Sequence, residues 1–105
     1  MADNYIPISS WAEDDKPREK MLLKGVASLS VNELLAILLR SGSGEESALD
    51  LARRILADSN NDLNLLARLS VSDFMSRYKG VGMAKAASII AAMELGRRRA
   101  LSTVR

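Results

Sequence analysis

Hydrophobic residues recur along the chain every three or four positions, and no segment shows the strict alternation that is typical of a β-strand. Polar stretches rich in Ser, Asn, Asp and Gly separate the periodic segments. The pattern predicts an all-α fold of five or six short helices without a sheet. The expected helices cover residues 17–24, 31–40, 48–58, 62–68, 71–78 and 83–99.

Start signals for helices support these boundaries. Three pairs share the spacing of a capping interaction, in which a Ser accepts a hydrogen bond at the helix start and an acidic residue follows three positions later. They are Ser30 with Glu33, Ser47 with Asp50, and Ser70 with Asp73. Pro17 suits the first turn of a helix, with Asp14 and Asp15 before it at the positive end of the helix dipole. We expect that helix to end at Gly25.

The apolar faces of the expected helices define one core. The second helix has apolar residues at positions 31, 34, 35 and 38. Trp11 is interpreted as a lid on the core. The residues expected to be mostly buried are Leu34, Leu38, Leu51, Ile55, Phe74, Ile89, Ile90 and Met93.

Two segments of the chain look like copies of one unit. Leu29-Ser30-Val31 returns as Leu69-Ser70-Val71, and Gly42-Ser43-Gly44 corresponds to Gly80-Val81-Gly82. Such a repeat predicts that residues 31–56 and 71–94 form two helix–turn–helix units related by an approximate two-fold axis. The alternative is that any two amphipathic helix pairs would align this well.

The second Gly-x-Gly turn carries the most specific local pattern. Two glycines permit positive φ and a close approach of the backbone to a ligand, Val81 can fill the inside of the turn, and Ala86 lets the helices approach. The free N–H groups at the start of the last helix then form a phosphate site. The candidate site residues are Lys79, Gly80, Val81, Gly82, Met83, Ala84 and Lys85, with possible further DNA contacts at Arg77, Arg97 and Arg98. The alternative is a well-packed turn with glycine caps.

The first turn differs, because Glu45 and Glu46 follow its glycines. Carboxylates at a helix start satisfy the dipole and repel an anion. We therefore interpret the first turn as structural.

Charge and composition narrow the possible functions. Residues 1–52 carry five Lys and Arg against nine Asp and Glu, a net charge of −4, whereas residues 53–105 carry ten against four, a net charge of +6. This asymmetry favours a polyanionic partner for the second half.

The chain of 105 residues has no Cys and no His, which excludes disulfides, a thiol nucleophile, an imidazole base and the usual zinc ligands. We expect no metal, no cofactor, no small-molecule substrate and no catalysis.

Apolar runs are too short to cross a membrane, and the first residues lack the features of a signal peptide. We therefore expect a cytoplasmic protein that does not associate with membranes.

The turn at residues 79–86 resembles the helix-hairpin-helix DNA-binding motif. Beyond it, residues 8–99 resemble the N-terminal domain of the RadC family of bacterial proteins, historically called DNA repair proteins. The matching segments are residues 11–20, 29–30, 33–42, 51–52, 80–82, 85–86 and 94–98. The resemblance implies a pseudo-symmetric pair of helix-hairpin-helix units of the type found in domain 2 of RuvA. Many relatives carry a basic residue in the first turn where this chain has Glu45 and Glu46, which weakens a clamp that uses both hairpins.

In the RadC family, a C-terminal domain of the JAB/MPN metalloprotease-like fold follows, with a zinc site. This chain has no His, so we expect that domain and its hydrolase activity to be absent here. The resemblance implies an extension packed on the core at 1–12, the hairpin domain at 13–100, and the start of a linker at 101–105.

Two functions fit these features. The leading hypothesis is a DNA-binding module that contacts backbone phosphates without reading sequence. The alternative is a docking domain that presents its own C-terminal neighbour and contacts no nucleic acid. The segment Pro17-Arg18-Glu19-Lys20 is interpreted as structural, although Arg18 and Lys20 could also contact DNA.

Overall fold

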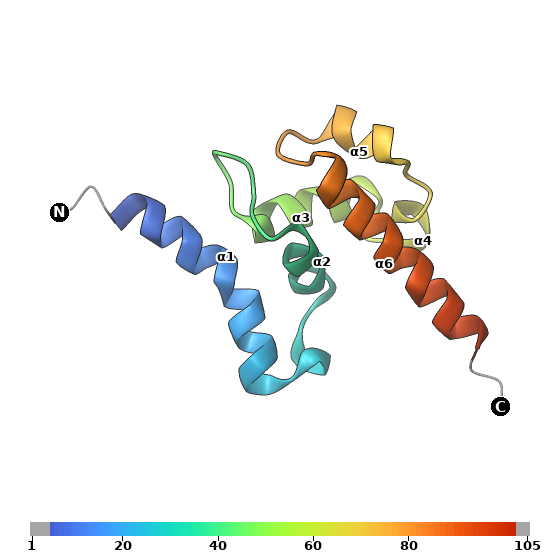
Figure 1. Cartoon of the computed structure of the whole chain (residues 1–105), viewed down its shortest axis with the longest axis horizontal. Helices are drawn as coiled ribbons and strands as arrows, with labels where there is room; N and C mark the ends of the chain where they lie inside the picture. Colours follow the sequence, from blue (N-terminus) through green and yellow to red (C-terminus); the bar gives the residue numbers. More distant parts are fainter. Residues whose placement is uncertain (1–4, 103–105) are drawn as a thin grey trace.

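The computed structural model describes residues 5–102, with side chains described from residue 13 onward. The regular elements in this part of the chain are all helices, and it contains no strand, as the hydrophobic pattern predicted (Figure 1). The elements are α1 (Tyr5–Lys24), the 3₁₀ turn η2 (Val26–Ser28), α2 (Val31–Leu39), α3 (Ala48–Asp58), α4 (Leu63–Leu66), α5 (Val71–Arg77) and α6 (Met83–Leu101).

The first helix is longer than predicted. The prediction that it starts at Pro17 is wrong, because α1 begins at Tyr5 and contains Pro17 in its interior. A proline removes one backbone hydrogen bond and bends a helix without always ending it, and the axis of α1 changes direction along its length in Figure 1. Ion pairs at i,i+3 spacing, Lys16 with Glu13 and Arg18 with Asp15, support the helix on either side. Its end is as predicted, because Gly25 follows with φ 91°.

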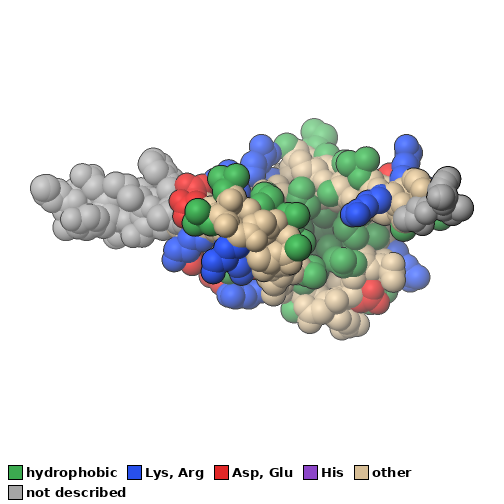
Figure 2. All heavy atoms as spheres, turned by 90° about the horizontal axis from the view of Figure 1, so that it is seen from below, with side chains coloured by type: hydrophobic (Ala, Val, Ile, Leu, Met, Phe, Trp, Pro, Cys, Tyr) green, Lys and Arg blue, Asp and Glu red, His purple; other side chains and the backbone are tan. Residues whose placement is uncertain are grey.

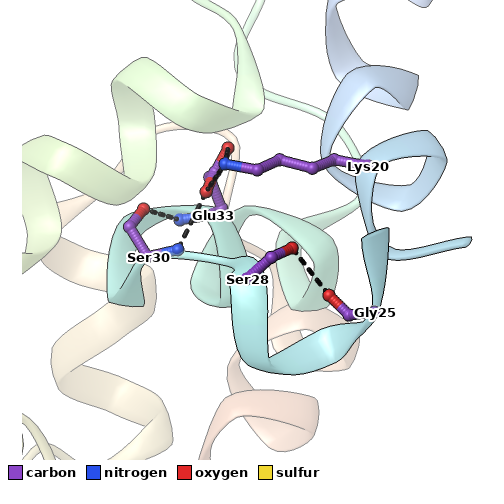
Figure 3. A network of polar contacts seen from close by, with 5 residues as sticks. All are labelled: Lys20, Gly25, Ser28, Ser30 and Glu33. Atoms are coloured by element: carbon purple, nitrogen blue, oxygen red, sulfur yellow. Dashed lines mark hydrogen bonds and ion pairs between the residues drawn. The ribbon is translucent and has the colours of Figure 1, made fainter. Parts of the chain in front are cut away.

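All three predicted caps are present. Ser30 with Glu33 and Ser70 with Asp73 form complete capping boxes, and the Ser47 hydroxyl accepts a hydrogen bond from the Asp50 N–H. Glu33 also accepts from the Lys20 ammonium at 3.1 Å, which ties α1 to the start of α2 (Figure 3). Because the Ser30 N–H and Lys20 both bind its ionised form, the pKa of Glu33 lies below its usual range.

The core lies where α2 packs against α3 and α6, and where α5 packs against α6. Leu51, Ile55, Phe74 and Ile89 are buried as predicted, and Leu38, Ile90 and Met93 pack against them while partly exposed. The buried residues of the core are Leu35, Ala36, Leu39, Ala48, Leu51, Ala52, Ile55, Leu56, Leu66, Phe74, Tyr78, Val81, Ala86 and Ile89.

The predicted inner face of α2 is partly wrong. Leu34 is 39% exposed and Val31 47% exposed, whereas Leu35, Ala36 and Leu39 are buried. Seven of the nine α2 residues are apolar, so the sequence pattern fits more than one face. The contacts with α3 and α6 select the face.

Tyr78 was not expected in the core. It follows α5, is 2% exposed, and its hydroxyl donates to Asp58 at 2.7 Å while Arg54 lies 5.5 Å from the ring centroid. Burial and the bond to Asp58 raise the pKa of Tyr78 to about 12. Since Arg54 and Asp58 belong to α3, this residue fastens the end of α5 to the first unit.

The helices of each predicted unit lie together, α2 with α3 and α5 with α6. The two-fold relation between the units stays a prediction.

The proposed packing of residues 1–12, including Trp11, concerns side chains outside those described. In the described residues no helix is both long and apolar enough to cross a membrane. Hydrophobic side chains do gather on one face (Figure 2), and Leu22 and Leu23 are more than 80% exposed.

Candidate nucleic-acid interface

The second turn, residues 78–82, joins α5 to α6. The Val81 N–H donates to the Tyr78 carbonyl at 3.1 Å, and Gly80 adopts φ 93°, a conformation that favours glycine. Val81 is 4% exposed, so it fills the inside of the turn as expected. Gly82 differs from the expectation, because its φ of −90° is open to any residue. A Cβ added at Gly82 would meet nothing within 4 Å, so the site is open there.

The start of α6 presents backbone N–H groups to solvent. Gly82 is the N-cap and has no side chain to bond them, and the first intrahelical bond runs from Ala86 N–H to the Gly82 carbonyl at 3.0 Å. The N–H groups before Ala86 therefore have no helical partner. Met83 is 66% exposed, so the helix end is not covered by core side chains. This arrangement can accept an anion.

The two flanking lysines have different surroundings. Lys79 is exposed, whereas Lys85 is half-buried and donates to the Ser41 carbonyl at 2.8 Å and to its hydroxyl at 2.9 Å. Burial and the nearby charge of Arg40 lower the pKa of Lys85. Lys85 thus ties the second turn to the first, a contact for which the sequence contains no signal.

The two turns also touch through their backbones. A Cβ added at Gly80 would lie 3.1 Å from both Cα and Cβ of Ser43. Two features therefore favour glycine at position 80: its positive φ and the close approach of the first turn. Together with the Lys85–Ser41 bonds, this contact fixes the second turn against the first.

The first turn, residues 40–47, has a different helix start. Glu45 and Glu46 were expected at the start of the following helix, but α3 begins at Ala48, beyond both. Glu46 pairs instead with Arg54. The carboxylate at the α3 start is Asp14 of α1, which accepts from the Ala48 N–H at 2.7 Å. Asp14 was expected at the start of its own helix and lies inside α1. A carboxylate does occupy the α3 start, but it comes from Asp14 and not from Glu45 or Glu46, and the structural role expected for this turn stays a prediction.

The remaining candidate cations lie in two places. Arg97 and Arg98 both bind Glu94 at 2.8 Å, and these bonds lower the pKa of Glu94 to about 2. At 1.5 Å per residue, Arg97 lies about 22 Å along α6 from Gly82. Arg77 is exposed at the end of α5, next to the second turn. Among residues 5–102, no group of three or more acidic, His or Cys side chains is placed to hold a metal ion.

The chain is similar to known proteins over most of its length. The family model described as UPF0758 N-terminal matches residues 8–87. UPF0758 proteins from Flavobacterium johnsoniae and Moorella thermoacetica are 55% and 51% identical to this chain over 98 and 99 residues, which is 93% and 94% of the chain. A UPF0758 protein from Alkaliphilus oremlandii is 46% identical over 99 residues, 94% of the chain.

The chain spans 42% of the length of each of these relatives. No solved structure matches it. The family model and these identities show that the chain belongs to the UPF0758 family of RadC-like proteins and corresponds to their N-terminal part.

Proposed function

We propose that this chain is a sequence-independent DNA-binding module of a RadC-like protein, which holds a backbone phosphate at the second turn. The observation that carries the proposal is the uncapped start of α6, where Gly82 supplies no side-chain bond and no Cβ obstructs the approach of a ligand. A phosphate oxygen would accept from the N–H groups of residues 83–85, at the positive end of a 19-residue helix.

The charges around the α6 start support this proposal. Lys79 is exposed beside the turn and adds long-range attraction. Lys85 contributes its charge while its ammonium stays bound to Ser41. No side chain of the turn is suited to reading a base, so all DNA sequences should bind alike. A single hairpin neutralises few phosphates, and such binding has a Kd of about 10⁻⁴ to 10⁻⁶ M at physiological salt.

Gly82→Asp tests the proposal directly. Asp is among the best N-cap residues, and both the backbone and the open space at Gly82 accept it, so the variant should fold. Its carboxylate takes the N–H groups and repels phosphate, so affinity for duplex, forked and single-stranded DNA should be lost. Gly44→Asp is the matched control, because Gly44 is also exposed and has open space around it in the first turn.

Fluorescence anisotropy at two salt concentrations would measure the effect. Lys79→Ala should weaken binding to all sequences and reduce the salt slope by roughly one. If Gly82→Asp binds as tightly as the original chain, or if the original chain binds no DNA at low salt, the phosphate site is refuted.

The alternative is a docking module, and one observation favours it. An apolar groove lies between α4 and the second half of α6, lined by Leu63, Met93 and Leu101 among others. The relatives are more than twice as long as the matched region, so further chain is present in them to cover such a groove. On this proposal the N-terminal part would present a metalloprotease-like domain. Absence of DNA binding combined with association with the remainder of a relative would favour it.

A further inference from the structure

Arg40 occupies a backbone conformation that suits glycine. It follows α2 with φ 68° and ψ −41°, and the Ser41 N–H donates to the Leu39 carbonyl at 2.7 Å across it. This is a γ-turn with positive φ, a rare and strained form for a residue with a Cβ. Glycine would adopt it freely. The chain nevertheless has an arginine here.

The Arg40 guanidinium has no carboxylate partner among the described residues, and its side chain is exposed. Most other described arginines do have such a partner. Those in ion pairs are Arg18, Arg53, Arg54, Arg97 and Arg98. An ion pair within the fold therefore does not account for Arg40.

A favourable interaction with the negative end of α2 is the simplest alternative role. The Lys85 ammonium already supplies a cation there, since it binds the Ser41 carbonyl one residue beyond Arg40. Adding Arg40 places two positive charges close together, and the Arg40 charge contributes to lowering the pKa of Lys85. The carboxylate of Asp14 acts on Lys85 from nearby, while it accepts from the Ala48 N–H. Among the described residues, neither Lys85 nor Arg40 forms an ion pair with a carboxylate.

These two cations come from different segments that lie close together, because Lys85, in the first turn of α6, binds the residue that follows Arg40. Lys85 is the third residue of that helix, and its ammonium reaches the residue next to Arg40. A guanidinium presents several N–H donors in a planar fork that matches phosphate oxygens. A phosphate bound at this point would neutralise the positive charges of both Arg40 and Lys85.

We propose that Arg40 is the DNA contact of the first hairpin, and that its guanidinium binds a backbone phosphate next to the one held at the start of α6. This inference rests on the proposed function and deepens it: the two hairpins contact the same DNA through different groups. The second uses backbone N–H groups, and the first uses one arginine that follows α2.

Arg40→Gly separates this role from a structural one. Glycine suits φ 68°, so the variant should melt at the same temperature as the original chain or at a higher one. DNA affinity should nevertheless fall several-fold, and the salt slope should decrease by roughly one. Arg40→Gln, which keeps the Cβ but removes the charge, should weaken DNA binding to a similar extent.

Arg53→Gln is the matched control. It removes one charge from an exposed arginine of the same hairpin, on α3, where Arg53 pairs with Asp50. Its DNA affinity should stay close to that of the original chain. If Arg40→Gly or Arg40→Gln binds like Arg53→Gln while Gly82→Asp abolishes binding, the Arg40 contact is refuted and the α6 phosphate site stands. If the original chain binds no DNA at low salt, both proposals fall.

Discussion

The two glycine turns are similar in sequence and opposite in electrostatics. At the first, the start of α3 is bonded by the Ser47 hydroxyl and by Asp14 from α1. At the second, the start of α6 has neither. Five acidic residues, Glu13, Asp14, Glu45, Glu46 and Asp50, line the groove around the first turn. Two turns of similar sequence can thus both pack against the core while only the second leaves the start of its helix without a side-chain cap.

The largest expected effect tests whether the two units fold together. Phe74 of α5 is fully buried in the common core, so Phe74→Ala should lower the free energy of unfolding by about 3–5 kcal/mol. Met75→Ala is the control, because Met75 is 49% exposed and should cost far less. Urea denaturation followed by circular dichroism should show one transition for each variant. Two separate transitions would mean that the units are independent.

A second comparison concerns the glycines of the first turn. A Cβ at Gly42 would lie 1.9 Å from the Glu46 carbonyl oxygen, whereas one at Gly44 would meet nothing within 4 Å. Gly42→Ala should therefore lower the free energy of unfolding by about 1–3 kcal/mol through overpacking, and Gly44→Ala should change it little. Gly82→Ala in the second turn should behave like Gly44→Ala. Equal losses for Gly42→Ala and Gly44→Ala in thermal melts would contradict the described backbone.

Asp14 can be tested as the cap of α3. Asp14→Ala removes the acceptor of the Ala48 N–H, and the loss is partly offset because Ala favours the α1 helix. We expect a net loss of about 0.5–1 kcal/mol in the free energy of unfolding. Glu13→Ala, which loses only the exposed pair with Lys16, is the control. The amide exchange rate of Ala48 should rise in the first variant and stay constant in the second.

The smallest expected effect is a dependence on pH that both units share. The pKa values of Glu33 and Asp73 both lie below their ordinary values, chiefly because each carboxylate accepts from the backbone N–H of its capping serine. A lowered pKa in the folded state adds stability above the unfolded pKa, and this stability is lost as the pH falls through the folded pKa. Thermal melts of Glu33→Gln and Asp73→Asn should each show a weaker acid dependence than the original chain. An unchanged acid dependence in both variants would show that the capping carboxylates are not responsible.

Local features of this fold could be predicted from the sequence, and long-range ones could not. The three serine caps depend on residues three positions apart, so their spacing was sufficient to locate the starts of α2, α3 and α5. The burial of Val81 also followed from its place between two glycines. The start of α1 was missed because Pro17 has the same local signature at a helix start and within a bent helix.

Only the backbone part of the candidate site could be predicted from the sequence. The open start of α6 followed from glycine at the N-cap. The partners of the charged side chains did not, because Lys85 binds Ser41 at a separation of 44 residues and Asp14 binds Ala48 at a separation of 34. The unusual conformation of Arg40 has no sequence signal, since most positions with positive φ carry glycine.

The contact between Gly80 and Ser43 has a consequence for protein engineering. An exposed glycine- and serine-rich loop is normally a good place to insert a tag or a fluorescent label. Here the contact makes part of the first loop a support for the second turn, since Ser43 lies against Gly80 and Ser41 holds Lys85. An insertion before Ser43 would displace that support, whereas one at Gly44 enters open space. Two neighbouring positions in one loop should therefore differ sharply in their tolerance of added residues.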